Sequence, residues 1–139
     1  MRFTDVRQVP ASAGQVWTAL HDREVLHAVI PGCERLSPLG AGRYSATLAA
    51  RVGRLADTYH GTFVRLVLDE QVVETLEFET ADPGLQGVMT MTTTLTDAAG
   101  GGTDVRIEHE GLPDAVPAAD NETGTRMALA NLAALVEGR

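Results

Sequence analysis

The sequence contains no lysine, and all of its 11 basic residues are arginine. The missing amine excludes three kinds of site from this chain: a lysine that forms a Schiff base, a lysine general base and the lysine of a phosphate-binding P-loop. No segment matches a dinucleotide-binding fingerprint or a nucleophile elbow either. The sequence therefore shows none of the most easily recognised enzyme motifs.

Cysteine is nearly absent, and long apolar runs are missing. The single cysteine, Cys33, cannot form a disulfide within the chain, which favours a reducing compartment. No stretch approaches the roughly 18 apolar residues that a membrane span needs, and residues 1–10 lack the apolar centre of a signal peptide. We therefore expect a cytoplasmic protein without stable membrane insertion. We interpret Cys33 as a small buried hydrophobic residue, because no base stands at a fixed spacing from it.

Positive charge is also scarce, since 19 acidic residues face 11 basic ones and the formal net charge is −8. A surface of this kind repels the phosphates of nucleic acids and of anionic lipids. We therefore expect neither a nucleic acid nor a membrane as a partner.

The N-terminal part of the chain predicts one strand followed by two short helices. The strand covers residues 2–9. Ser12 and Gln15 have the spacing of a capping box, and apolar residues follow at helical intervals. A second short helix begins after Asp22 and ends before Pro31 and Gly32.

From residue 43 onward apolar and polar residues alternate, as they do in strands that bury one face. Five strands are predicted, at residues 43–52, 55–67, 71–80, 85–96 and 103–111. Gly61 lies inside the second of these, where an interior glycine often marks a bulge or a sharp bend. The inward face of residues 55–67 stays open, because both of its faces carry apolar residues.

The C-terminal segment supplies the cover for this one-sided sheet. Asp120 is a suitable N-cap for a helix at about residues 120–137, and Leu129, Leu132 and Val136 recur along one face of that helix. The length of 139 residues is that of one ordinary domain. We predict a single α+β domain over residues 1–139, with the helix-grip fold: a curved antiparallel six-stranded sheet wrapped around a long C-terminal helix, and two short helices after the first strand.

Several segments resemble known families. The C-terminal half is similar to bacterial members of the activator-of-heat-shock-protein-ATPase homologue family, through His109-Glu110-Gly111-Leu112-Pro113 and Asp120-Asn121-Glu122-Thr123-Gly124-Thr125-Arg126-Met127. The N-terminal part resembles the wider SRPBCC/START-like superfamily, through Val9-Pro10-Ala11, Val16-Trp17 and Leu20. Residues 30–34, Ile-Pro-Gly-Cys-Glu, resemble the G-type subunit of carbon monoxide dehydrogenase. The resemblance implies the helix-grip fold but no single function, because the superfamily includes lipid carriers, hormone receptors, polyketide cyclases and chaperone-binding domains.

The four histidines do not form a pattern that binds metal. They are His21, His27, His60 and His109. No two of them are spaced as ligands on one helix face are, and no carboxylate completes a set of three ligands. We therefore predict no metal and no other cofactor.

The register of the last strands is expected to follow the symmetry of the two turns that join them. A turn centred on Gly100 places Met91 opposite His109. A turn through Pro83 gives three further pairs: Phe78 opposite Met89, Leu76 opposite Met91 and Glu74 opposite Thr93.

These pairs gather apolar side chains and a few polar groups on the concave face. A mostly apolar cleft with isolated polar anchors is the usual form of a small-molecule site, and flexible methionines suit an adaptable pocket. The predicted lining residues are Val29, Ile30, Glu74, Leu76, Phe78, Met89, Met91, His109 and Met127. The alternative is that these side chains only pack against the C-terminal helix.

Three functions remain open at this stage. The leading hypothesis is the binding of a small apolar or aromatic molecule, which includes lipids. The first alternative is a cyclase- or lyase-type enzyme that uses His109 or Glu74 as an acid or base, with His60 and Tyr59 as further candidates. The second is a protein-interaction domain, for which the resemblance implies a chaperone-associated role. Whether the chain forms a homodimer also stays open.

Overall fold

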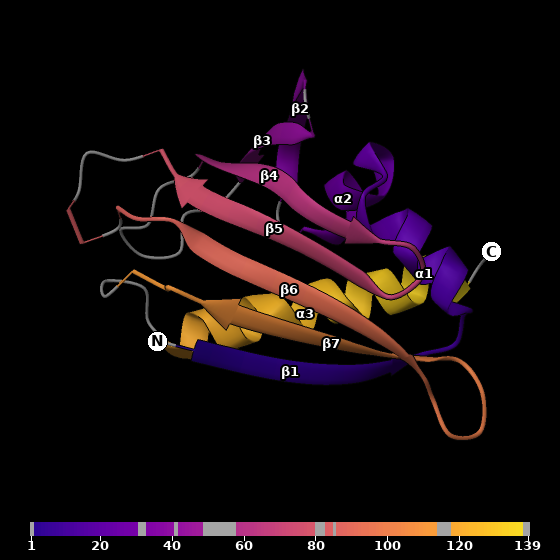
Figure 1. The fold of residues 1–139 in the computed structure, drawn as a ribbon. Coiled ribbons are helices and arrows are strands. Elements are labelled where there is room, and N and C mark those ends of the chain that lie inside the picture. Colours follow the sequence, from indigo (N-terminus) through magenta and orange to yellow (C-terminus); the bar gives the residue numbers. More distant parts are fainter. Residues whose placement is uncertain are drawn as a thin grey trace.

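The computed structural model describes residues 2–30, 33–40, 42–48, 58–79, 83–84, 86–113 and 118–137. The elements follow in the order β1 (Arg2–Val9), α1 (Ala13–Leu20), α2 (Arg23–Val29), β2 (Cys33–Gly40), β3 (Arg43–Leu48), β4 (Thr58–Val67), β5 (Gln71–Phe78), β6 (Met89–Asp97), β7 (Thr103–Glu110) and α3 (Ala118–Glu137). One curved sheet carries α3 along one of its faces, and α1 and α2 stand beside one end of that helix (Figure 1).

The predicted α+β helix-grip fold is confirmed, with one strand more than expected. In the described part of the chain, seven strands are antiparallel to their neighbours in the order β1-β7-β6-β5-β4-β3-β2. The additional strand is β2, whose sequence contains Pro38 and does not alternate. Proline removes a ladder hydrogen bond and is tolerated at the edge of a sheet, and β2 is an edge strand.

Local sequence signals place the helices where they were expected. The backbone N–H of Gln15 donates to Ser12 Oγ over 3.2 Å, and the Ser12 N–H donates to Gln15 Oε1 over 3.0 Å, which completes the capping box. The Asp22 carboxylate accepts from the Glu24 N–H at the start of α2. Helix α3 begins at Ala118, two residues before the predicted start, so that Asp120 lies in its first turn. Pro31, Gly32, residues 49–57, residues 80–82 and Gly138 lie outside the described residues.

One of the two predicted registers is confirmed and the other is wrong by two residues. Met91 lies opposite His109, as the turn at Gly100 predicts. Glu74, however, lies opposite Met91, and Leu76 lies opposite Met89. Strand β6 begins only at Met89, and Gly87 has a φ of +125°, so a long connection rather than a tight turn joins β5 to β6. Turn symmetry fixes a register only across a short loop. A shift of two residues leaves every side chain on its expected face.

The buried apolar residues form two clusters rather than one. The first cluster joins the stripe of α3 to β1, β6, β7 and the two short helices, through Val9, Val16, Ala19, Val25, Leu95, Val105, Ile107, Leu129, Leu132, Ala133 and Val136. The second cluster lies on β3 and the adjoining ends of β5 and β6, through Tyr44, Ala46, Leu76 and Met89, together with Leu112. Among the described residues, only Met91 packs against both clusters.

Two polar contacts fix the short helices over the sheet. The Trp17 indole N–H donates to the carbonyl of Gln71 over 3.3 Å, which joins α1 to the start of β5. The Asn131 side-chain amide donates to the carbonyl of Val29 over 3.1 Å, which joins the end of α2 to α3. Within the described part of the chain, no helix combines the length and apolar character that crossing a membrane requires.

The packing of α3 generates a stability prediction. Leu132 is only 1% exposed in the first cluster, whereas Met127 on the same helix is 50% exposed. Leu132→Ala should lower the free energy of unfolding by about 2–5 kcal/mol, because it removes buried apolar area and leaves a cavity. Urea unfolding measures the change. Met127→Ala is the control and should cost less than about 0.5 kcal/mol; equal costs for the two variants would contradict the packing.

Candidate ligand-binding site

The centre of the second cluster is a hydrogen bond between two side chains that lie two strands apart. Tyr44 in β3 pairs with Gly61 in β4, and Gly61 pairs in turn with Leu76 in β5. A Cβ atom at position 61 would overlap the ring and hydroxyl of Tyr44. The side chain of Tyr44 therefore passes over β4 at Gly61, the position where β4 carries no side chain. Its hydroxyl donates to Glu74 Oε1 over 3.0 Å, at a buried position.

The missing side chain at Gly61 allows the close approach of Tyr44, whereas the sequence pattern suggested a bulge or a sharp bend at this position. The irregularity in the pairing of β4 with β5 falls between Phe63 and Arg65. Tyr44 is a residue of the candidate site that the sequence pattern did not single out. An interior glycine beside a strand that contains a large aromatic residue is the signal that could have indicated it.

Glu74 is an unusual carboxyl group because it is 3% exposed inside an apolar cluster. Burial raises the pKa of Glu74 to about 7, although the hydrogen bond from Tyr44 acts in the opposite direction. Burial, followed by the nearby charge of Glu74, also raises the pKa of both Tyr44 and Tyr59. The two phenols therefore stay protonated at neutral pH, while Glu74 can hold or release its proton there.

Aromatic rings surround this carboxyl group on the inner face. Phe63 lies directly opposite Glu74 in the ladder, and Tyr59 lies opposite Phe78. Tyr44 contacts Phe63 at a centroid distance of 5.8 Å and Tyr59 at 6.2 Å, and Tyr59 contacts Phe78 at 6.4 Å. The rings meet at angles between 40° and 82°, so they form an uneven wall rather than a stack.

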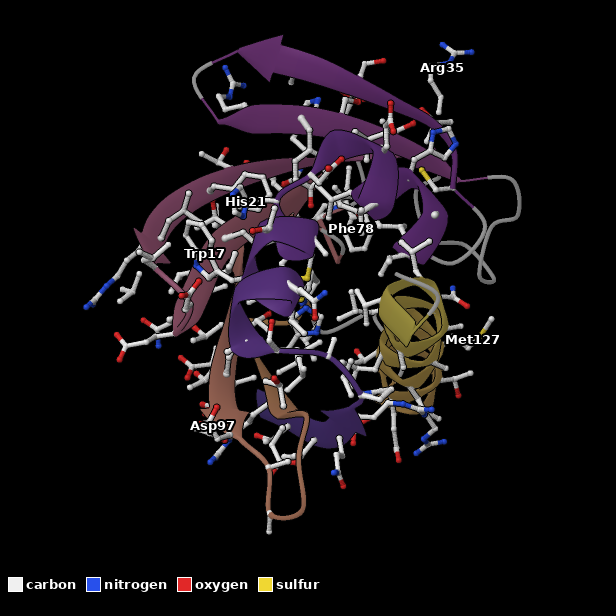
Figure 2. The ribbon with its side chains drawn as sticks, turned by 90° about the vertical axis from the view of Figure 1, so that its right-hand side faces the viewer. Trp17, His21, Arg35, Phe78, Asp97 and Met127 are labelled. Carbon is white, nitrogen blue, oxygen red and sulfur yellow. The ribbon has the colours of Figure 1, made fainter. Side chains whose placement is uncertain are left out.

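The structure brings most of the predicted site residues together on this face. Glu74, Met91 and His109 form one row across β5, β6 and β7. Leu76, Phe78, Met89, Met91 and Ile30 belong to the second cluster or pack against it, whereas Val29 packs against the first. Met127 stands apart, since it is 50% exposed and projects away from the sheet on the far side of α3, while Phe78 lies inside (Figure 2).

The partial exposure of the inner aromatic residues distinguishes this face from an ordinary core. Tyr59, Phe63, Phe78 and Met91 are only partly buried, although they lie against the second cluster. Cys33 is also partly buried there, and burial raises the pKa of its thiol. No α3 side chain among the described residues takes part in this cluster. The inner face of β3, β4 and β5 is therefore covered by its own aromatic residues and by α2, not by the long helix.

A separate groove with a volume of about 770 Å³ lies where the β6–β7 turn meets the start of α1. Its lining residues are Gln8, Pro10, Ala11, Ser12, Gln15, Gly100, Gly101 and Gly102. It contains no ionisable side chain and none of the predicted site residues. The chemistry of the second cluster therefore makes that cluster the stronger candidate. Among the residues that the structure describes, no three His, Cys, Asp or Glu side chains come together as metal ligands do.

Comparison with known proteins identifies relatives over nearly the whole chain. The model of a family described as Activator of Hsp90 ATPase homolog 1-like protein matches residues 10–137. A crystal structure of a protein from Chromobacterium violaceum is 29% identical with a TM-score of 0.84, and the match covers 98% of this chain and 96% of that one. No curated protein matches the chain.

Two more distant structures share the fold. The AHSA1-like protein from Aeromonas hydrophila is 18% identical with a TM-score of 0.69, over 99% of this chain and 93% of that one. A conserved protein from Geobacillus kaustophilus is 15% identical with a TM-score of 0.80, over 99% of this chain and 96% of that one. The resemblance of residues 30–34 to the G-type subunit of carbon monoxide dehydrogenase stays a prediction from the sequence.

The raised pKa of Glu74 predicts a stability that depends on pH. A carboxyl group whose pKa rises from its ordinary value of 4.5 to about 7 on folding binds its proton more tightly in the folded state. Its contribution is present below pH 4.5 and is lost as the pH rises through about 7, and the difference amounts to about 3 kcal/mol. Glu74→Gln should remove this loss. Chemical unfolding at pH 5 and pH 8 measures it.

The control for this experiment is the exposed Glu77 on the same strand. Glu77→Gln should keep the pH dependence of the unmodified chain. If Glu74→Gln and the unmodified chain lose the same stability between the two pH values, Glu74 is not the titrating group.

The crossing of Tyr44 over Gly61 predicts a specific steric conflict. Gly61→Ala should lower the free energy of unfolding by about 1–3 kcal/mol, because the new methyl group must displace the Tyr44 ring. The same substitution in a Tyr44→Ala background should cost clearly less, and this difference is the coupling between the two positions. Thermal and urea unfolding measure both. Gly124→Ala in α3 is the control, since a Cβ there meets nothing within 4 Å; a penalty at position 61 that does not depend on Tyr44 would refute the crossing.

Proposed function

Because the chain belongs to the Activator of Hsp90 ATPase homolog 1-like protein family, we propose that it binds a small apolar or aromatic molecule on the inner face of β3, β4 and β5. The lining that we propose consists of Val29, Ile30, Glu74, Leu76, Phe78, Met89, Met91 and His109 from the sequence prediction, together with Tyr44, Tyr59 and Phe63. Met127 is left out, because it is half exposed and points away from the sheet.

The observation that carries this proposal is the division of the core. A long helix that covered the whole inner face would bury the aromatic residues against its own stripe. Here Leu129, Leu132 and Val136 belong to the first cluster only. Among the inner aromatic side chains, those of Tyr59, Phe63 and Phe78 keep part of their surface accessible to solvent. Partly exposed apolar side chains around a few buried polar groups are typical of a small-molecule site.

The composition supports a cytoplasmic location for this activity. A single cysteine removes any need for an oxidising compartment. The net charge of −8 disfavours association with anionic membranes or nucleic acids. We therefore propose that the ligand is encountered in aqueous solution inside the cell.

A neutral fluorescent probe, N-phenyl-1-naphthylamine, tests the proposal. It should bind the unmodified chain and raise the Tm, because a ligand that binds only the folded state stabilises it. Met91 is partly buried and contacts both clusters, so Met91→Trp should fill the space and weaken binding at least tenfold. Fluorescence titration gives the affinity, and circular dichroism checks that the fold is retained.

The matched control is Met127→Trp, the same substitution at an exposed position of α3. It should leave the affinity for the probe unchanged. The proposal fails if the unmodified chain does not bind the probe, or if Met127→Trp weakens binding as much as Met91→Trp does. Unfolding of Met91→Trp would also overturn it, because the space would then have been packed solid.

A further inference from the structure

We propose that the ligand carries a positive charge, as a protonated amine or a quaternary ammonium group attached to an apolar body, and that this group contacts the Glu74 carboxylate within the aromatic wall. The inference rests on the proposed function and names the class of ligand for the same site. It depends on three features of the second cluster: a buried acid that has no cationic partner among the described residues, the rings near it, and the direction of its hydrogen bond with Tyr44.

Glu74 lacks a counter-ion among the residues that the structure describes. The arginines whose side chains are described are all exposed, namely Arg7, Arg35, Arg43, Arg65, Arg106 and Arg126. The ion pairs in the described part of the chain join other residues, such as His60 with Glu79 and Arg126 with Glu122. A buried carboxylate without a cation is unfavourable, and a ligand that brings the missing charge removes that cost.

The aromatic wall is suited to the same kind of group. The faces of aromatic rings carry partial negative charge and attract cations, most strongly where water is excluded. Phe63 lies opposite Glu74 in the ladder. The Tyr44 ring contacts Phe63 at 40° on one side and Tyr59 at 75° on the other. Rings that are tilted against one another turn their faces in different directions. We propose that some of these faces contact the ammonium group.

The hydrogen bond from Tyr44 orients the carboxylate for this task. The phenol donates to Oε1, so it favours the ionised form of Glu74 and holds one oxygen in place. The remaining oxygen, Oε2, is the one that we expect to contact the cation. A neutral ligand with an acceptor group would need the opposite state, in which Glu74 is protonated and donates.

These two ligand classes predict opposite responses to pH. A cation requires ionised Glu74, so its affinity should increase as the pH rises through about 7, whereas a neutral acceptor should bind more weakly over the same range. The other titratable groups that face the cluster are Tyr44, Tyr59, Cys33 and His109, with His21 in ring contact with Phe63. A protonated histidine on this face would also repel a cation at low pH, so a substitution at Glu74 must separate the two effects.

A matched pair of probes tests the inference by titration calorimetry: 1-naphthylmethylammonium and the neutral 1-naphthylmethanol, which share one ring system. At pH 8 the ammonium should bind the unmodified chain at least tenfold more tightly than the alcohol. Glu74→Gln should abolish that preference by weakening the binding of the ammonium at least tenfold. Circular dichroism shows whether the variant is folded. Glu77→Gln removes one exposed charge from the same strand and should keep the full preference.

Each other result has a distinct meaning. Equal or tighter binding of the alcohol to the unmodified chain overturns the cation inference and leaves the proposed function standing. A preference for the ammonium that survives in Glu74→Gln, or disappears in Glu77→Gln, assigns it to the overall negative charge and also overturns the inference. If neither naphthyl probe binds but N-phenyl-1-naphthylamine does, the cation inference fails alone; if none of the three binds, the proposed function fails with it.

Discussion

The interior of this domain is organised around the hydrogen bond from Tyr44 to Glu74. The two residues are contributed by β3 and β5, and the bond spans β4 only because Gly61 has no side chain there. Burying this one carboxyl group among aromatic rings raises the pKa of Glu74 and keeps Tyr44 and Tyr59 protonated. Phe63 and Phe78 belong to the same group of rings. The close packing of the first cluster stabilises the fold and offsets the cost of burying the Glu74 carboxyl group.

The separation of the two clusters explains how one chain combines a close-packed core with a buried carboxyl group. The stripe of α3 is used entirely on the side of β1, β6 and β7, where it forms an ordinary close-packed core. The side of β3, β4 and β5 has a different composition: its described residues include four aromatic rings and the carboxyl group of Glu74, and the thiol of Cys33 from β2 packs against them. Met91 connects the two sides, and this position makes it sensitive to any change in either of them.

The sequence predicted the parts of the fold that depend on local patterns. Periodicity identified the helices and most strands, and a tight turn at Gly100 fixed the register that places Met91 opposite His109. The sequence patterns missed β2, because this edge strand contains a proline and does not alternate. They also placed Glu74 opposite the wrong residue of β6, because a long loop joins β5 to β6. The approach of Tyr44 to Glu74 depends on two successive strand pairings and an absent side chain. No single pattern along the chain contains that information, although Glu74 itself was predicted.

The crossing at Gly61 also constrains how this family member can change over time. A substitution at position 61 alone meets the Tyr44 ring, and the loss of Tyr44 alone leaves Glu74 without its donor. The three positions are therefore expected to be coupled, so that a change at one alters the cost of a change at another. The rings of Phe63 and Phe78 are not bound by that restriction, because neither is required for the crossing. Substitutions should therefore be tolerated more readily in the aromatic wall than at the tyrosine, the glycine and the acid.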